Sequence, residues 1–463
     1  MRRGTIAAII FVLLGLIPAG LSVRYGNAFP LSGDQTVLPP GTDLNEDTLD
    51  KPREEFHSEA IGGAKSYMVN LGDLAFNSNL ILGGPARRAG MSCGTCHVNG
   101  AGNGHLFVPG MSTRPGNFDT TGPLFNPKAH DKARDPVRIP SLRGARYLAP
   151  YGNDGRIASL REFVRNVIVN EFAGPEPSPA ILDAMVDYIE DIDFLPNLNL
   201  AAGGRLGVRA ADEAQRRGEA LFFKPFPHNP EFSCAGCHIP SSWFVDNRRH
   251  NVGSGGVFKT PTLMNANFNA PYFHDGRFDT YDQVIDHFDR TFELGLSSQD
   301  HADLVVYLKT IGDGLQPYER DGVSAAIKEV NDFARVLGPA IAAHDNDVIA
   351  LAVHTVGSEL RDLVEQFPGV KDTTVEGGRD ERLAARSELK NLVLVVRRIG
   401  LLAADGYYDE AAAEYLNFRK LMVRNVPFVL EQAQPWSLFN PDVHDAHFAA
   451  MRQLLQSAQK LQH

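Results

Sequence analysis

Residues 92–100 read SCGTCHVNG, and residues 233–241 read SCAGCHIPS. Each stretch contains a Cys-x-x-Cys-His motif, and the two motifs use all four cysteines of the chain. Two thiols three residues apart project from one side of a helical turn, where they can add to the two vinyl groups of a haem. The histidine that follows can then bind the iron from the proximal side. The sequence therefore predicts two covalently bound haem c groups.

The predicted attachment residues are Cys93, Cys96 and His97 in the first motif and Cys234, Cys237 and His238 in the second, with the two histidines as proximal iron ligands. Paired cysteines also occur in three different kinds of site. A zinc site uses paired cysteines but does not require a histidine after each pair. A thioredoxin-like dithiol needs a βαβ context, which neither motif has. A disulfide within each pair stays open in an oxidising compartment.

Length and charge limit the remaining possibilities. The chain has 463 residues, enough for three domains of roughly 100–150 residues each. Its net charge of −11 argues against nucleic acid as a partner. An acidic surface suits a basic electron-donor protein instead.

The N-terminal residues 1–28 have the pattern of an export signal. Arg2 and Arg3 precede an apolar stretch of 16 residues, Thr5–Gly20, which is short for a membrane span. Small residues lead up to Ala28, after which we expect cleavage. The protein is therefore expected in the periplasm, with an uncleaved membrane anchor as the alternative.

The sequence around each motif is repeated. PSLRGARYLAPYGNDGR begins at Pro140, and PTLMNANFNAPYFHDGR begins at Pro261, with an Asp-Gly-Arg turn in both. A Gly-acid pair in residues 72–76 and 218–222 precedes the motifs, and amphipathic stretches at 182–192 and 301–311 follow them. We predict a mainly α fold with two tandem class-I-like cytochrome c domains, at residues 50–200 and 205–318.

The C-terminal third has a different composition. Residues 320–463 contain no cysteine and show helical periodicity throughout. Ile327, Val330, Phe333, Ala334 and Leu337, for example, fall on one face of a helix. We expect a helical bundle of about four helices that serves packing or docking.

Both repeats, about residues 50–318, resemble the bacterial di-haem cytochrome c peroxidases and the related MauG-type enzymes. The closer match is CAGCHIPSSWFVDNRRHNVG followed by FKTPTLMNANFNAPYFHDGRFDTYDQVIDHF in the second repeat. The resemblance implies a peroxide-reducing haem in the N-terminal domain and an electron-transfer haem in the C-terminal domain. It also implies a distal glutamate that moves the proton at the first haem. Glu171 lies nearest the expected position, Glu162 is the alternative, and the second repeat has no counterpart of Glu171.

The chain departs from the family pattern at several positions. Phe288 stands where the family has an iron ligand at the second haem, Asn153 replaces a bridging tryptophan, and Thr113 replaces a displaceable histidine. The candidate residues for electron transfer between the haems are then Tyr151, Tyr272 and Trp243. Candidate sixth ligands are Met111, His105, His287 and Met264, and His130, His250 and His274 are weaker candidates. Arg138 stands at the family's calcium position, so no calcium site is predicted.

The motifs and the resemblance together predict an exported di-haem cytochrome that reduces hydrogen peroxide. The expected electron donor is a small periplasmic protein, either a cytochrome c or a cupredoxin. Two alternatives stay open: a pure electron-transfer cytochrome, and a MauG-like oxidase acting on a partner protein or an organic substrate. A homodimer is also left open.

Overall fold

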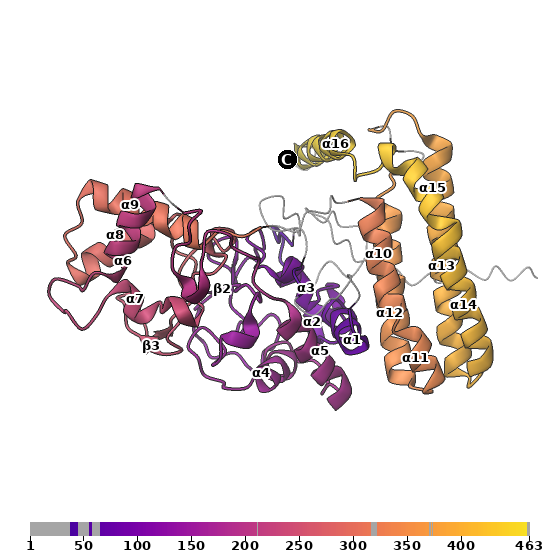
Figure 1. Ribbon diagram of the computed structural model, residues 1–463. Coiled ribbons are helices and arrows are strands. Elements are labelled where there is room, and N and C mark those ends of the chain that lie inside the picture. Colours follow the sequence, from indigo (N-terminus) through magenta and orange to yellow (C-terminus); the bar gives the residue numbers. More distant parts are fainter. Residues whose placement is uncertain are drawn as a thin grey trace, which may run out of the picture.

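The computed structural model describes residues 38–44, 55–57, 65–210, 212–315, 322–369, 372 and 374–460, with side chains up to residue 450. The predicted signal peptide, residues 1–28, lies outside the described residues. The chain is mainly helical, as predicted (Figure 1). Among the described helices, none is both long enough and apolar enough to cross a membrane.

The first repeat, the described part of residues 50–200, consists of short helices and one two-stranded ribbon. Its elements are α1 (Tyr67–Phe76), α2 (Gly84–Arg88), α3 (Cys93–Cys96), η3 (Val98–Gly100), β1 (Asn117–Phe118), β2 (Val137–Arg138), η4 (Ala145–Tyr147), α4 (Leu160–Asn166), the π-helical η5 (Val167–Glu171) and α5 (Pro179–Asp191).

The second repeat, the described part of residues 205–318, follows the same order after η6 (Ala202–Gly204). It contains α6 (Glu213–Phe223), α7 (Cys234–Cys237), η7 (Pro240–Ser242), β3 (Arg249–His250), β4 (Phe258–Lys259), η8 (Ala266–Phe268), α8 (Tyr281–Phe292) and α9 (Ser298–Ile311). In each repeat the two strands pair antiparallel.

In each repeat a glycine lets the first helix cross the last one closely. A Cβ atom on Gly72 of α1 would lie 1.9 Å from the carbonyl oxygen of Ala184 in α5. A Cβ atom on Gly218 of α6 would lie 2.2 Å from the carbonyl oxygen of Asp303 in α9. Because real Cβ atoms do not approach oxygen so closely, only glycine fits at these crossings.

The two repeats contact each other through equivalent backbone positions. The amide of Arg138 in β2 donates to the carbonyl oxygen of His274 at 2.6 Å, and the amide of Lys259 in β4 donates to that of Asn153 at 2.9 Å. Each loop with an Asp-Gly-Arg turn is therefore held by a strand of the other repeat, which fixes how the two Cys-x-x-Cys-His motifs are placed.

The C-terminal residues fold into a bundle, as the periodicity predicts. Its elements are α10 (Val323–Ala334), α11 (Leu337–Ala342), α12 (Asn346–Glu365), α13 (Arg379–Ala404), α14 (Tyr408–Arg424), α15 (Val426–Ala433) and η9 (Gln434–Trp436). The last helix, α16 (Pro441–Lys460), lies apart from the bundle in Figure 1. Ile327, Val330, Phe333, Ala334 and Leu337 are all buried. The described part thus contains more helices than the four expected, because the chain breaks at α11 and α15.

The bundle shares a core with the first repeat. Buried side chains of α10 and α12 join those of α1 and α5 in one continuous apolar cluster. His354 of α12 also forms a 2.7 Å hydrogen bond with the side-chain oxygen of Asn79. Figure 1 shows α10 and α12 next to the first repeat, with α13 and α14 on the far side of the bundle.

Candidate functional site

The first Cys-x-x-Cys-His motif forms a single helical turn, α3. Ser92 is the N-cap residue of this turn, and its backbone amide donates a hydrogen bond to the hydroxyl oxygen of Thr95 at 3.1 Å. The Nδ1 atom of His97, directly after the turn, lies 3.0 Å from the carbonyl oxygen of Pro140. A carbonyl can only accept, so Nδ1 carries the proton and the lone pair of Nε2 is left free for a metal. Burial lowers the pKa of His97 to about 4, which keeps the ring neutral.

The second motif is built in the same way. Ser233 caps α7 by accepting a hydrogen bond from the amide of Gly236 at 3.0 Å. His238 Nδ1 lies 3.1 Å from the carbonyl oxygen of Phe244, and the backbone of Pro261, which aligns with Pro140, also hydrogen-bonds the ring. Burial lowers the pKa of His238. Both histidines therefore present Nε2 as the free ring atom.

The residues of both motifs fit a haem. All four thiols are unpaired, so the disulfide alternative is not formed in this structure. Phe76 lies 6.3 Å from the ring of His97, and Phe222 lies 6.5 Å from that of His238. Each phenylalanine contacts a buried tyrosine at 5.1 Å, Tyr188 or Tyr307. The two sites thus have matched apolar surroundings on the histidine side.

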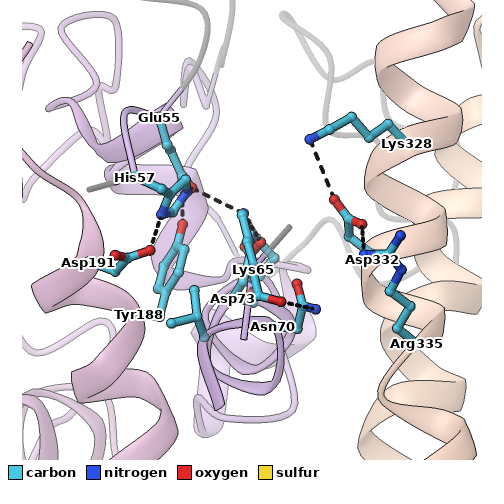
Figure 2. A network of polar contacts seen from close by, with 12 residues as sticks. Glu55, His57, Lys65, Asn70, Asp73, Tyr188, Asp191, Lys328, Asp332 and Arg335 are labelled. Atoms are coloured by element: carbon cyan, nitrogen blue, oxygen red, sulfur yellow. Dashed lines mark hydrogen bonds and ion pairs between the residues drawn. The ribbon is translucent and has the colours of Figure 1, made fainter. Parts of the chain in front are cut away.

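A buried polar network distinguishes the first site from the second (Figure 2). Glu55 accepts a hydrogen bond from Tyr188, and His57 lies between Glu55 and Asp191, at 2.7 and 2.8 Å. Lys65 contacts Asp73 at 2.5 Å. In the second repeat the hydroxyl of Tyr307 is buried without a hydrogen-bond partner among the described residues.

This network is charged. Burial alone would raise the pKa of Glu55, but Lys65 and His57 lower it to about 2. Burial by itself would lower the pKa of Lys65. The nearby carboxylates of Asp73 and Glu55 outweigh this effect and raise the pKa of Lys65 above its ordinary value. Burial raises the pKa of Asp73. The first repeat therefore buries several charged groups, and the rings of Phe76 and Tyr188 lie between these groups and His97.

Glu171 lies at the end of the π-helical turn η5, directly before Phe172. Its side chain is buried, and its carboxylate accepts hydrogen bonds from Nη2 of Arg156 at 3.0 Å and from the side-chain Nδ2 of Asn166 at 3.2 Å. Burial raises the pKa of Glu171, while Arg156 and a hydrogen bond from Thr120 act in the opposite direction. A buried carboxyl with a raised pKa has the properties of a proton carrier.

Glu171 is close to the first motif through its neighbour. Phe172 belongs to an apolar cluster with Met111, Phe118 and Phe125, and the thiols of Cys93 and Cys96 pack against this cluster. Glu162, in contrast, is exposed in the first turn of α4. Glu171 is thus buried near the first motif, whereas Glu162 is exposed to solvent.

The candidate sixth ligands fall into two groups. Met111 is buried in the cluster beside the first motif, and Met264 packs in the cluster that includes Cys234. His105 is exposed, and Nε2 of His287 is engaged by the carbonyl oxygen of Val252 at 2.7 Å.

The other histidines have protein partners. His130 contacts the carbonyl oxygen of Thr121 at 3.3 Å, His250 contacts Asp246 at 2.6 Å, and the ring of His274 stacks on Phe258 at 3.6 Å. Cys237, Asp246 and His250 also offer ligand atoms within 4.8 Å of one another, but Cys237 belongs to the second motif. The two methionines therefore stay the better-placed predictions.

The sequence did not reveal two features of the site. Trp243 of the second repeat stacks on Tyr147 of the first, with ring centroids 4.1 Å apart and an angle of 11°. Trp243 was a candidate relay, but nothing in the sequence marks Tyr147 as its partner. Arg156, which binds Glu171, was visible only as part of the repeated Asp-Gly-Arg turn, a signal that could have suggested it.

The chain is similar to several known proteins. Residues 212–345 match the family model described as di-haem cytochrome c peroxidase. Hydrazine synthase subunit gamma of Kuenenia stuttgartiensis is 26% identical over 375 residues, which cover 67% of this chain and 95% of that protein. The methylamine utilization protein MauG of Methylorubrum extorquens is 29% identical over 21% of this chain and 34% of its own length. Cytochrome-c peroxidase IdrP1 of a Pseudomonas species is 31% identical over 12% of this chain and 18% of its own length.

The family model begins at the N-terminus of α6 and extends beyond the second repeat, so it includes the second motif. Members of this family use haem, and its peroxidase and MauG members are oxidoreductases. The predicted resemblance is therefore confirmed over residues 212–345, which match the model of the di-haem cytochrome c peroxidase family.

Proposed function

We propose that this protein is an exported di-haem cytochrome whose two repeats are tandem cytochrome c domains, each with a covalently attached haem. Its reaction is the reduction of hydrogen peroxide at the first motif, with electrons relayed through the second motif from a small periplasmic cytochrome c or cupredoxin. When bound, the haem iron supplies the electrons and the coordination position for peroxide.

The observation that carries this proposal is the buried carboxyl of Glu171 beside the first motif. Reduction of peroxide to two water molecules consumes two electrons and two protons. Glu171 gives its proton to the departing oxygen as the O–O bond breaks and regains a proton from solvent. Arg156 and Asn166 hold the carboxyl in place, and burial raises its pKa toward the working range.

The test compares two carboxamide variants of the haem-loaded protein. Glu171→Gln should lower the peroxide turnover by about 10²–10⁴, while the haem content and the absorption spectrum stay unchanged. Glu162→Gln makes the same chemical change on an exposed side chain of α4 and should keep its turnover. Full turnover in Glu171→Gln, or loss of turnover in Glu162→Gln, would remove Glu171 from the mechanism.

The stacked rings of Tyr147 and Trp243 support a relay between the two repeats. Asn153 replaces the tryptophan expected for this role, and its carbonyl is used to bind the amide of Lys259. Trp243 follows His238 by a few residues, directly before Phe244, whose carbonyl holds the ring of His238. The stack therefore begins next to the second motif and ends in the first repeat.

A second candidate function is electron transfer without peroxide chemistry, as a subunit of a larger redox enzyme. Two observations favour it: Met111 is buried in the cluster that contacts Cys93 and Cys96, and the match to hydrazine synthase subunit gamma covers 95% of that subunit. Absorption and EPR spectra taken before and after one equivalent of peroxide separate the two. A high-spin signal that peroxide changes supports the peroxidase, and two low-spin haems that ignore peroxide support the electron carrier.

A further inference from the structure

The bundle has an apolar stripe on the side opposite to its core. On α13, Leu389, Leu392 and Val396 are fully buried. On the opposite side of the same helix, Leu394 and Leu401 are 63% and 56% exposed. These two leucines are seven residues apart, which is about two helical turns, so they lie on one line along the helix.

The neighbouring helix continues this pattern. On α14, Phe418 and Met422 are buried, while Leu416 and Val423 are 67% and 68% exposed and again seven residues apart. Phe428 of α15 is 61% exposed. The three helices pack against one another, so these exposed side chains lie on neighbouring helices. This surface, called the outer face, consists of Leu394, Leu401, Leu416, Val423 and Phe428.

In the central parts of α13 and α14, the exposed charged side chains are of one sign. Between residues 387 and 401, and between residues 413 and 424, the exposed charged side chains are Lys390, Arg397, Arg398, Lys420 and Arg424. Within the described part of the chain, none of these five forms an ion pair. Glu388 and Glu414 of the same segments are half-buried. The exposed acids lie nearer the helix ends, including Asp409 and Glu410 in the first turn of α14, and Glu431 three residues after Phe428 in α15. The chain as a whole has a net charge of −11, so this group of exposed cations differs in sign from the overall charge of the protein.

We propose that the outer face docks the protein onto an anionic lipid bilayer. Helix faces that combine leucine and phenylalanine with lysine and arginine bind at the membrane interface, where the apolar side chains enter the headgroup boundary and the cations face anionic lipids. Lysine and arginine reach the lipid phosphates while their aliphatic stems lie along the leucines.

The composition favours lipid over a protein partner. Binding hot spots between proteins are enriched in tryptophan, tyrosine and arginine, and leucine and valine are under-represented in them. On the outer face the opposite holds, since four of its five apolar side chains are leucine or valine. Figure 1 shows α13 and α14 on the side of the bundle away from the two repeats, so docking there would not cover the repeats.

The experiment measures co-sedimentation of the full-length, haem-loaded protein with vesicles of phosphatidylglycerol and phosphatidylethanolamine, or of phosphatidylcholine alone. The wild-type protein should bind the anionic vesicles and release them at high salt. Arg397→Gln with Arg398→Gln should weaken binding by about 30-fold, and Leu394→Gln with Leu416→Gln by about tenfold or more.

Two matched controls make the same chemical changes elsewhere. Arg248→Gln with Arg249→Gln removes two exposed cations of the second repeat, and Val208→Gln removes an apolar side chain that is 92% exposed between the repeats. Both should bind vesicles like the wild-type protein. If the outer-face variants also bind like these controls and a spin label on α13 stays open to water, the proposal is wrong.

All variants share the apolar N-terminal stretch, so co-sedimentation alone does not tell which part of the protein binds lipid. A spin label on α13 reports contact with lipid at that helix only. A nitroxide on Ser387→Cys, an exposed position of α13, should become shielded from a water-soluble relaxation reagent on anionic vesicles. A nitroxide on Ser298→Cys, at the start of α9, should stay accessible. An accessible label at 387 would overturn the proposal, as would a lipid-free dimer that Leu394→Gln with Leu416→Gln dissociates, because the outer face would then be a protein interface.

Discussion

Arg138 and Lys259 occupy equivalent positions in the two repeats, and each side chain hydrogen-bonds the backbone of the other repeat. Arg138 Nη1 donates to the carbonyl oxygen of Asn269 at 3.0 Å. Lys259 Nζ donates to the carbonyl oxygens of Leu148 and Pro150, the latter at 2.7 Å. Two side-chain cations thus face the inter-repeat carbonyls at the place where the family resemblance implied calcium.

The crossed contacts predict that Lys259 stabilises the interface between the repeats. Lys259→Met keeps the aliphatic stem but leaves two carbonyl groups without their donor, so the free energy of unfolding should fall by about 1–3 kcal/mol. Urea denaturation measures this change, and amide exchange at residues 148–153 should become faster. Lys128→Met, at an exposed position, is the control. Equal stability of the two variants would show that the contacts contribute nothing.

The close crossing of α1 and α5 predicts that Gly72 cannot be replaced. In Gly72→Ala the new methyl group would lie 1.9 Å from the carbonyl oxygen of Ala184, so the helices must separate. We expect a loss of about 1–3 kcal/mol in the free energy of unfolding, measured by denaturation.

A second glycine provides the matched control. Gly357 lies inside α12, where the nearest atom to an added Cβ is the end of the Arg361 side chain at 3.4 Å. Gly357→Ala should be neutral or stabilising by up to about 1 kcal/mol. A Gly72→Ala variant that behaves like Gly357→Ala would mean that the helix crossing is not tight in solution.

The sequence predicted those parts of the structure that depend on local pattern. Helical periodicity placed Ile327 and Phe333 in the core, and both are buried. The glycines at residues 72 and 218 were recognised as part of the repeat, but the helix crossings that they allow were not predicted. Spacing alone predicted that each Cys-x-x-Cys would form one helical turn, as α3 and α7 do.

Other parts depend on contacts between distant residues, which no local pattern encodes. The stack of Tyr147 on Trp243 and the reach of Lys259 to Pro150 both arise from the way one repeat docks on the other. The different burial of Glu171 and Glu162 was also not predictable, because both stand in helical sequence. The number of bundle helices was underestimated since the periodicity continues through the breaks at α11 and α15.

The buried network predicts that Glu55 stabilises the protein in a pH-dependent manner. The pKa of Glu55 is about 2 in the folded protein, below its ordinary value of 4.5. Its contribution should therefore be complete above about pH 4.5 and be lost as the pH falls toward 2. Glu55→Gln should lower the free energy of unfolding by about 3 kcal/mol at pH 7.

Denaturation of wild-type and Glu55→Gln protein at pH 7, 5, 4 and 3 checks this expectation. The difference between them should shrink as the pH falls, although burial raises the pKa of Asp73 and gives that group the opposite trend. Glu231→Gln, an exposed position in the second repeat, should show no difference at any pH. A constant difference for Glu55→Gln would mean that Glu55 acts through packing and not through its charge.

The stacked rings predict that Trp243 matters more for electron transfer than for stability. Trp243→Leu removes the stack on Tyr147, which is worth about 0.5–1.5 kcal/mol, so the fold should survive. If electrons cross through this pair, transfer from the second haem to the first should slow, as measured by stopped-flow absorption after selective reduction of the second haem. Trp436→Leu, in the bundle, is the matched control and should leave the transfer rate unchanged. Trp243→Phe should restore part of the rate, because an aromatic ring again faces Tyr147. An unchanged rate in Trp243→Leu would show that the haems exchange electrons without this pair.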